Sequence, residues 1–166
     1  AKLLSYPIQA VSICSSLSEK INNSFKEIDI ILSPALGGIV VGYEIGRQLK
    51  KQTIFAERVD KDLVLRRGFE IPKNSKVLIV EDVITTGKSA LECSKIIKDS
   101  KANLVGYACI IDRSDKDLKI KEKIISQIKL KINIYNKNNL PNDLKKIKPI
   151  KPGSRIISKW KKKDLV

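Results

Sequence analysis

Histidine and methionine are both absent from this chain of 166 residues. The lack of histidine excludes Ser-His and Cys-His nucleophile pairs as well as histidine ligands for a metal ion. Any metal ion must therefore be held by oxygen atoms. Cysteine is scarce, and the three residues of this type are Cys14, Cys93 and Cys109. Their wide spacing fits neither a disulfide framework nor a CxxC metal site, so we expect three reduced thiols.

Long apolar runs are absent too. No stretch approaches the roughly 20 apolar residues that a membrane span needs, and no charged start leads into the apolar core of a secretory signal. Hydrophobic residues make up 42% of the chain, which is enough to bury the core of one globular domain. We therefore expect a single cytoplasmic domain covering residues 1–166, with no membrane partner.

Aromatic residues account for only 5% of the chain, and this bears on the meaning of its charge. The formal net charge is +15, and residues 84–166 hold 21 of the 33 basic side chains but 8 of the 18 acidic ones. The basic runs there are not interleaved with the aromatic side chains that stack on bases. We interpret them as a solvated lysine surface with a basic tail at 156–166. An anion-attracting field is an alternative, and a nucleic-acid partner is not expected.

Short apolar runs alternate along the chain with segments of helical periodicity. Strands are predicted at 28–33, 53–58, 76–81 and 104–112, an edge strand at 127–135, and helices at 7–25, 37–51 and 89–98. Near-continuous apolar strands between helices are typical of an α/β fold with a parallel central sheet flanked by helices. Such sheets bind ligands beyond the carboxyl ends of their strands. The longest polar interruption, 59–75, has the length of a functional lid or a disordered segment.

The stretch VLIVEDVITTGKS (77–89) places two acids between a buried strand and a hydroxyl-rich turn. Its end is similar to a nucleotide-binding P-loop, but that motif needs a glycine where this chain has Asp82. Amides at the start of a helix, together with Thr and Ser hydroxyls, suit a phosphate monoester instead. The two carboxylates would repel a second phosphate but accept hydrogen bonds from a vicinal diol. A ribose 5-phosphate site is therefore predicted at Glu81, Asp82, Val83, Ile84, Thr85, Thr86, Gly87, Lys88 and Ser89. A polar strand end with a capping turn is the structural alternative.

The same stretch resembles the phosphoribosyl pyrophosphate signature of the type I phosphoribosyltransferases. Further stretches are similar to the branch of this family that acts on orotate, namely SPALGGIVVGYEIGRQL (33–49), FAERVDKDLVLRRGF (55–69), IIDRS (110–114) and KPGSR (151–155). The resemblance implies a Mg²⁺-dependent transfer of ribose 5-phosphate from phosphoribosyl pyrophosphate to orotate. The products would be orotidine 5′-monophosphate and pyrophosphate, in pyrimidine biosynthesis.

The resemblance also implies roles for residues outside that stretch. Backbone amides at Leu36, Gly37 and Gly38 would bind pyrophosphate, in the family often through a cis peptide. Mg²⁺ would be held mainly by the substrate and water, with no protein ligand. Thr85 and Arg113 match positions that contact orotate. For the glycines and for Arg113, the alternatives are tight strand-to-helix packing and an ordinary surface arginine.

A mobile loop near 59–69 is implied as well, with Arg58, Arg66 and Arg67 supplying positive charge to the departing pyrophosphate. In the family this loop closes over the neighbouring subunit, so a homodimer is implied. We take Arg66, Arg67 and Asp82 as the catalytic candidates. A solvated loop face is the alternative for the two adjacent arginines.

The chain departs from the family pattern in three respects. Its loop carries LRRGF where many members have a lysine and a histidine, which leaves open whether Arg66 or Arg67 is the key cation. Gly37 stands where some relatives have lysine. Most members carry several tens of residues before the point matching Leu3 and Leu4, so a fragment or a shortened form is expected. Two other functions stay open, a purine phosphoribosyltransferase and a non-catalytic regulator that senses phosphoribosyl pyrophosphate and binds RNA.

Overall fold

The computed structural model describes residues 2–115, 117–133, 135 and 138–148. The chain divides into two compact units, Ala1–Ile132 and Asn133–Val166. The described part of the second unit contains one short helix, α4 (Asn142–Lys145). The predicted basic tail at 156–166 and the KPGSR stretch lie outside the described residues.

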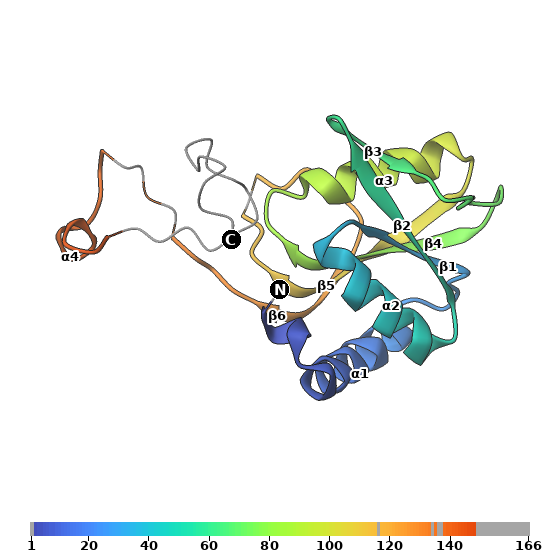
Figure 1. Cartoon of the computed structure of the whole chain (residues 1–166), viewed down its shortest axis with the longest axis horizontal. Coiled ribbons are helices and arrows are strands. Elements are labelled where there is room, and N and C mark those ends of the chain that lie inside the picture. Colours follow the sequence, from blue (N-terminus) through green and yellow to red (C-terminus); the bar gives the residue numbers. More distant parts are fainter. Residues whose placement is uncertain (1, 116, 134, 136–137, 149–166) are drawn as a thin grey trace, which may run out of the picture. The chain divides into compact units, whose positions relative to one another are not determined.

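The first unit is built around a six-stranded sheet with the strand order β3-β2-β1-β4-β5-β6 (Figure 1). The strands are β1 (Ile30–Pro34), β2 (Gln52–Val59), β3 (Asp62–Leu65), β4 (Lys76–Ile84), β5 (Asn103–Asp112) and β6 (Ile124–Lys129). The helices are η1 (Lys2–Ser5, a 3-10 turn), α1 (Pro7–Ser24), α2 (Gly37–Leu49) and α3 (Lys88–Asp99). All neighbouring strands pair in parallel except β3, which is antiparallel to β2. The predicted α/β fold is thereby confirmed.

The central strand β4 explains why the sheet has a helical layer on each face. Its side chains alternate, so that Val77 and Ile79 pack in the cluster that contains α3 residues, whereas Leu78 and Val80 pack with α1 and α2. All four are fully buried. A strand buried on both faces must be apolar at every position, which is the pattern seen in the sequence.

Helix α2 lies unusually close to the sheet. A Cβ atom on Gly42 would collide with the side chain of Ser33 on β1, and one on Gly46 with the side chain of Thr53 on β2. Both glycines are buried in the described structure. The absence of two side chains therefore sets the distance between α2 and the strands beneath it.

Two predicted segments differ from the structure. The polar stretch 59–75 is not a continuous loop, because β3 pairs with β2 in a hairpin and buries Leu63 at 6% exposure. The edge strand begins earlier than predicted and covers Ile124–Lys129, because Ile124 and Ile125 pack against the core from opposite faces. The mobility of the segment near 59–69 stays a prediction. Within the described residues, no helix has the length and apolarity needed to cross a membrane.

Candidate active site

The carboxyl ends of β1, β4 and β5 lie side by side and lead into segments that carry most of the predicted site residues. Two of these ends are tied together, because the backbone amide of Arg113 donates a 2.8 Å hydrogen bond to the carbonyl of Ile84. The segment that follows the third strand, β1, also lies close, because a Cβ atom on Gly37 would lie 2.8 Å from Oδ2 of Asp82. The structure therefore gathers residues 35–38, 82–89 and 113 at one edge of the sheet.

The two acids leave β4 on opposite faces. The predicted strand ended at Glu81, with Asp82 directly after it, but β4 continues to Ile84. Successive side chains of a strand alternate, so Glu81 points to the α3 side and Asp82 to the α2 side, where it meets Gly37. The Asp82 carboxylate is only partly buried and accepts a 3.0 Å hydrogen bond from the amide of Val83. Asp82 is thus the more accessible of the two.

Glu81 is a buried carboxylate, with 7% of its surface exposed. Among the described residues it forms no ion pair and no hydrogen bond through its side chain. Burial, and to a smaller extent the charge of Asp82, raises its pKa from 4.5 to about 7. Near neutral pH this group therefore exists as a mixture of its protonated and ionised forms.

The turn after β4 has the geometry of an oxyanion site. Gly87 precedes α3 in the left-handed region, with φ of 70°, which a residue without a side chain adopts without strain. The amide of Lys88 makes only a long hydrogen bond of 3.4 Å to Oγ1 of Thr86. The amides of Thr86, Gly87 and Ser89 donate no hydrogen bond within the described part of the chain. Thr85, Thr86 and Lys88 have exposed side chains, so the turn is open to a ligand.

The segment that joins β1 to α2 contains a cis peptide bond between Ala35 and Leu36. The amide of Ala35 donates to the carbonyl of Ala56 on β2, at 2.7 Å. Leu36 is 83% exposed, and Gly38 is packed so closely that a Cβ atom would lie 3.2 Å from the carbonyl oxygen of Val80. Gly38 therefore allows tight strand-to-helix packing, which was the alternative to a role in binding. Gly37 leaves the start of α2 adjacent to Asp82.

The arginines of the hairpin contact carboxylates that the sequence analysis did not single out. Nη2 of Arg58 lies 2.5 Å from Oε2 of Glu92 on α3. Nη2 of Arg67 lies 3.2 Å and Nε of Arg66 lies 3.8 Å from the carboxylate of Glu57 on β2. The two adjacent arginines are more than half exposed. Their positive charges are thus held by ion pairs that water can reach, and the sequence spacing contained no signal for these pairs.

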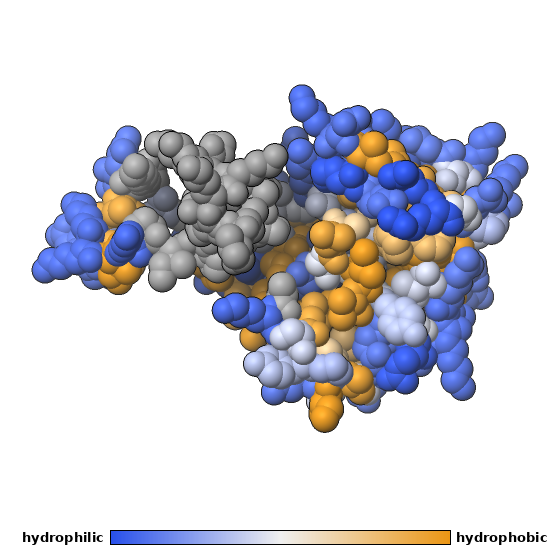
Figure 2. All heavy atoms as spheres, viewed as in Figure 1, coloured by the Kyte–Doolittle hydropathy of each residue, from blue (hydrophilic) through white to orange (hydrophobic). Residues whose placement is uncertain are grey.

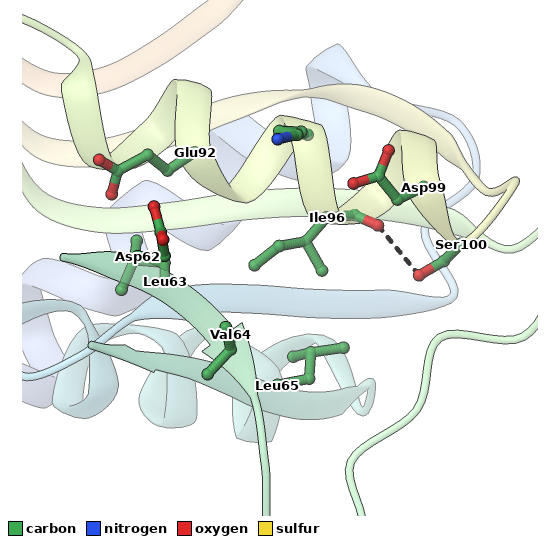
Figure 3. A pocket seen from close by; sticks show the side chains of 9 residues that line it. Asp62, Leu63, Val64, Leu65, Glu92, Ile96, Asp99 and Ser100 are labelled. Atoms are coloured by element: carbon green, nitrogen blue, oxygen red, sulfur yellow. Dashed lines mark hydrogen bonds between the residues drawn. The ribbon is translucent and has the colours of Figure 1, made fainter. Parts of the chain in front are cut away.

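A hollow lies between β3 and α3, with a volume of about 460 Å³ (Figure 3). Glu92 and Asp99 of α3 border it, Asp62 faces them from β3, and Leu63 and Ile96 supply apolar surface. None of the predicted site residues lines it. Glu92, which lines this hollow, also forms the ion pair with Arg58 of β2. We therefore place the candidate site at the strand ends and not in this hollow.

Comparisons with known proteins agree with this geometry. The family model of the phosphoribosyl transferase domain matches residues 7–142. The chain therefore belongs to the phosphoribosyl transferase family, as the signature at 77–89 predicted. One individual relative is the orotate phosphoribosyltransferase of Methylorubrum populi, which is 44% identical over 158 residues, covering 95% of this chain and 81% of that protein.

Solved structures show the same fold. The orotate phosphoribosyltransferase of Aeropyrum pernix matches with a TM-score of 0.63 and 19% identity, over 77% of this chain and 75% of that one. The adenine phosphoribosyltransferase of Saccharomyces cerevisiae matches with a TM-score of 0.65 and 19% identity, over 76% and 82%. Enzymes named for different bases match about equally well, so the fold does not distinguish the base.

Proposed function

We propose that this chain transfers ribose 5-phosphate from phosphoribosyl pyrophosphate to orotate, forming orotidine 5′-monophosphate and pyrophosphate. The observation that carries the proposal is 44% identity over 95% of the chain to a protein named orotate phosphoribosyltransferase. The gathering of the predicted pyrophosphate, phosphate and base positions at one sheet edge supports it. The reaction belongs to pyrimidine biosynthesis and would take place in the cytoplasm.

The ribose phosphate of the substrate occupies the turn after β4 in this proposal. The free amides of Thr86, Gly87 and Ser89 and the start of α3 favour an anion there. Asp82 accepts a hydrogen bond from the ribose diol, because its carboxylate is partly exposed and lies beside the pyrophosphate segment. Glu81 lies on the opposite, α3 side of the strand. It acts mainly through the electrostatic effect of its carboxylate on the ribose position.

Pyrophosphate binds at residues 35–38 and is neutralised by the hairpin arginines. Displacement at the anomeric carbon develops positive charge on the sugar and negative charge on the leaving group, so positioning and charge neutralisation supply most of the catalysis. Arg66 and Arg67 must exchange the single carboxylate of Glu57 for the more highly charged pyrophosphate. The arginine side chains are 60% and 62% exposed and can reach a ligand, whereas Glu57 is 20% exposed and loses both counter-charges in this exchange.

Magnesium belongs to the proposal as a cofactor. Within residues that the structure describes, no group of three or more Cys, Asp or Glu side chains could enclose a metal ion. Such an ion would be held mainly by substrate oxygens and water, beside the partly exposed carboxylate of Asp82. When bound, Mg²⁺ would neutralise charge on the pyrophosphate oxygens.

The proposed activity is tested by incubating the protein with orotate, phosphoribosyl pyrophosphate and Mg²⁺. We expect the orotate absorbance to fall with time, and the loss to stop when the metal is chelated with EDTA. Adenine, hypoxanthine and guanine in place of orotate are the matched controls and should not be consumed. Consumption of a purine base, or salt-dependent RNA binding without loss of orotate, would contradict the proposal in favour of one of the two alternative functions.

A homodimer is also part of the proposal, and the structure suggests the surface through which it forms. An apolar surface runs over η1, α1 and α2 (Figure 2), around a groove of about 330 Å³. Its most exposed members are Ile8 at 87%, Leu36 at 83%, Tyr43 at 66%, Tyr6 at 61% and Val40 at 49%. Val40 and Tyr43 lie on one face of α2, and Leu36, directly before the helix, continues their spacing. Because Leu36 also belongs to the pyrophosphate segment, a subunit that covers this surface reaches the active site.

Substitution of Tyr43 by glutamate should weaken the dimer by about 100-fold or more. The two-fold symmetry of a homodimer places the new charge twice in an apolar interface, where it has no partner. Sedimentation equilibrium at micromolar concentration measures the effect. Ile128→Glu, at another exposed apolar position on β6, is the control and should leave the mass unchanged. A parent protein that stays monomeric, or a Tyr43 variant that still dimerises, would rule out this interface.

A further inference from the structure

Asp112 is a buried carboxylate at the last position of β5, immediately before the predicted base-contact residue Arg113. It is 4% exposed. Oδ1 accepts a 2.8 Å hydrogen bond from the amide of Ser114, and Oδ2 lies 3.4 Å from Nζ of Lys129 on β6. A buried carboxylate without partners would be costly, so these contacts account for its presence in the core.

The protonation state of Asp112 agrees with these contacts. Burial alone would raise the pKa of its carboxyl group, but the hydrogen bonds from Ser114 and the charge of Lys129 outweigh burial and lower the pKa below its usual value. The group is therefore ionised at neutral pH. An ionised carboxylate accepts a hydrogen bond from a backbone amide more strongly than a neutral acid does.

The contacts of Asp112 fix the backbone on both sides of Arg113. The bond from its side chain to the amide two residues later closes a tight turn with Arg113 at the centre. The carbonyl of Asp112 accepts the amide of Leu130, at 2.8 Å, which anchors the turn to the segment after β6. On the other side, the amide of Arg113 is bound to Ile84 at the end of β4. The Arg113 side chain itself is exposed and forms no ion pair with the described residues.

We propose that Asp112 is a positioning residue for the acceptor base, holding the 112–114 turn so that the Arg113 guanidinium faces a planar carboxylate such as that of orotate. The inference depends on the proposed function, because it assigns a partner to Arg113. A guanidinium binds a carboxylate through two parallel hydrogen bonds, and this geometry tolerates little rotation of the supporting backbone. The turn therefore sets affinity for the base and not for the ribose phosphate, which binds after β4.

Two substitutions of Asp112 distinguish the effect of the 112–114 turn from the effect of the negative charge. Asp112→Asn keeps an oxygen that can accept from the Ser114 amide but removes the charge opposite Lys129. Asp112→Glu keeps the charge, but its longer side chain cannot close the same turn. We expect the asparagine variant to keep the KM for orotate within about threefold of the parent. The glutamate variant should raise it about 10-fold or more, with the KM for phosphoribosyl pyrophosphate within twofold in both.

A double-mutant cycle with Arg113→Ala provides the second measurement. If Asp112 acts through Arg113, the glutamate substitution should have no further effect on orotate binding once the guanidinium is absent. Orotate affinity is measured by calorimetry, with thermal unfolding recorded for every variant. An Asp112→Glu protein with a parental KM for orotate, or with both KM values raised equally, would overturn the inference. Additive effects of Asp112→Glu and Arg113→Ala on the affinity for orotate would also overturn it.

The parent protein distinguishes this failure from failure of the proposed function. A parent that neither binds nor consumes orotate contradicts the function itself, whatever the variants do. A parent that consumes orotate, with variants that show no selective change in the KM for orotate, contradicts only the role of Asp112. Loss of folding in the glutamate variant, seen as loss of the thermal transition, would show that Asp112 acts on stability and would also count against the inference.

Discussion

Asparagine in place of Asp82 should lower kcat/KM for phosphoribosyl pyrophosphate by about 10- to 100-fold and leave the fold unchanged. The carboxylate is partly exposed, and among the described residues it forms no ion pair. Its loss therefore removes little stability. A hydrogen bond to a charged group contributes about 1.5–3 kcal/mol, and about 1.4 kcal/mol corresponds to a factor of ten. Initial rates of orotate loss over a range of substrate concentrations measure the effect.

Two further variants make this experiment specific. Asp99→Asn, at the exposed end of α3, is the matched control and should keep parental kinetics. Gly37→Ala leaves Asp82 in place but adds a Cβ atom that would lie 2.8 Å from its carboxylate, which must then move. We expect this variant to lose activity with little change in melting temperature. Parental activity in the Asp82 variant would remove the central residue of the proposed site.

In the parent protein, we expect the free energy of unfolding to fall by about 3 kcal/mol between pH 4.5 and pH 7.5 because of Glu81. The Glu81→Gln variant should not show this fall. The pKa of Glu81 is raised from 4.5 to about 7 in the folded protein. Between these values the unfolded chain releases the proton while the folded protein keeps it, so the free energy of unfolding falls as pH rises. Above pH 7 both states are ionised, and the full cost of burying the charge is present. A shift of this size corresponds to about 3 kcal/mol.

Urea unfolding at several pH values measures this effect. The stability difference between Glu81→Gln and the parent should grow with pH through the stated window and become constant above it. Glu70→Gln, at an exposed position, is the control for other groups that titrate over the same range. A difference that is independent of pH would show that Glu81 is ionised in the folded protein throughout, and that some contact relieves its burial.

The fold was largely predictable, because the local pattern and the tertiary environment agree. Residues 77–80 are apolar at every position, and a strand covered on both faces needs such a sequence. The hairpin strand β3 was missed for the opposite reason. Its sequence is DLVL, it lies between charged residues, and of its four members only Leu63 is fully covered. A strand of this length has too few residues to show a period.

The directions of the site side chains were harder to predict than their positions in the sequence. The string VEDVI contained the necessary signal, since Val83 and Ile84 continue the apolar strand beyond the acids. Reading the strand to its real end would have placed Glu81 and Asp82 on opposite faces. The ion pairs of the hairpin arginines had no such signal. The pairs with Glu57 depend on the pairing of β2 with β3, and the pair of Arg58 with Glu92 depends on how β2 lies relative to α3.

The glycines of α2 have a consequence for the order of events at the site. Because Gly42 and Gly46 leave no gap above Ser33 and Thr53, the helix cannot slide or turn without a steric clash. We therefore expect the segment that precedes it, residues 35–38, to keep its shape when a ligand binds. Arg66 and Arg67, by contrast, are 60% and 62% exposed and are held by ion pairs to Glu57. If pyrophosphate binds as proposed, we therefore expect it to dock first against the closely packed segment before α2 and to be enclosed afterwards by the exposed arginines.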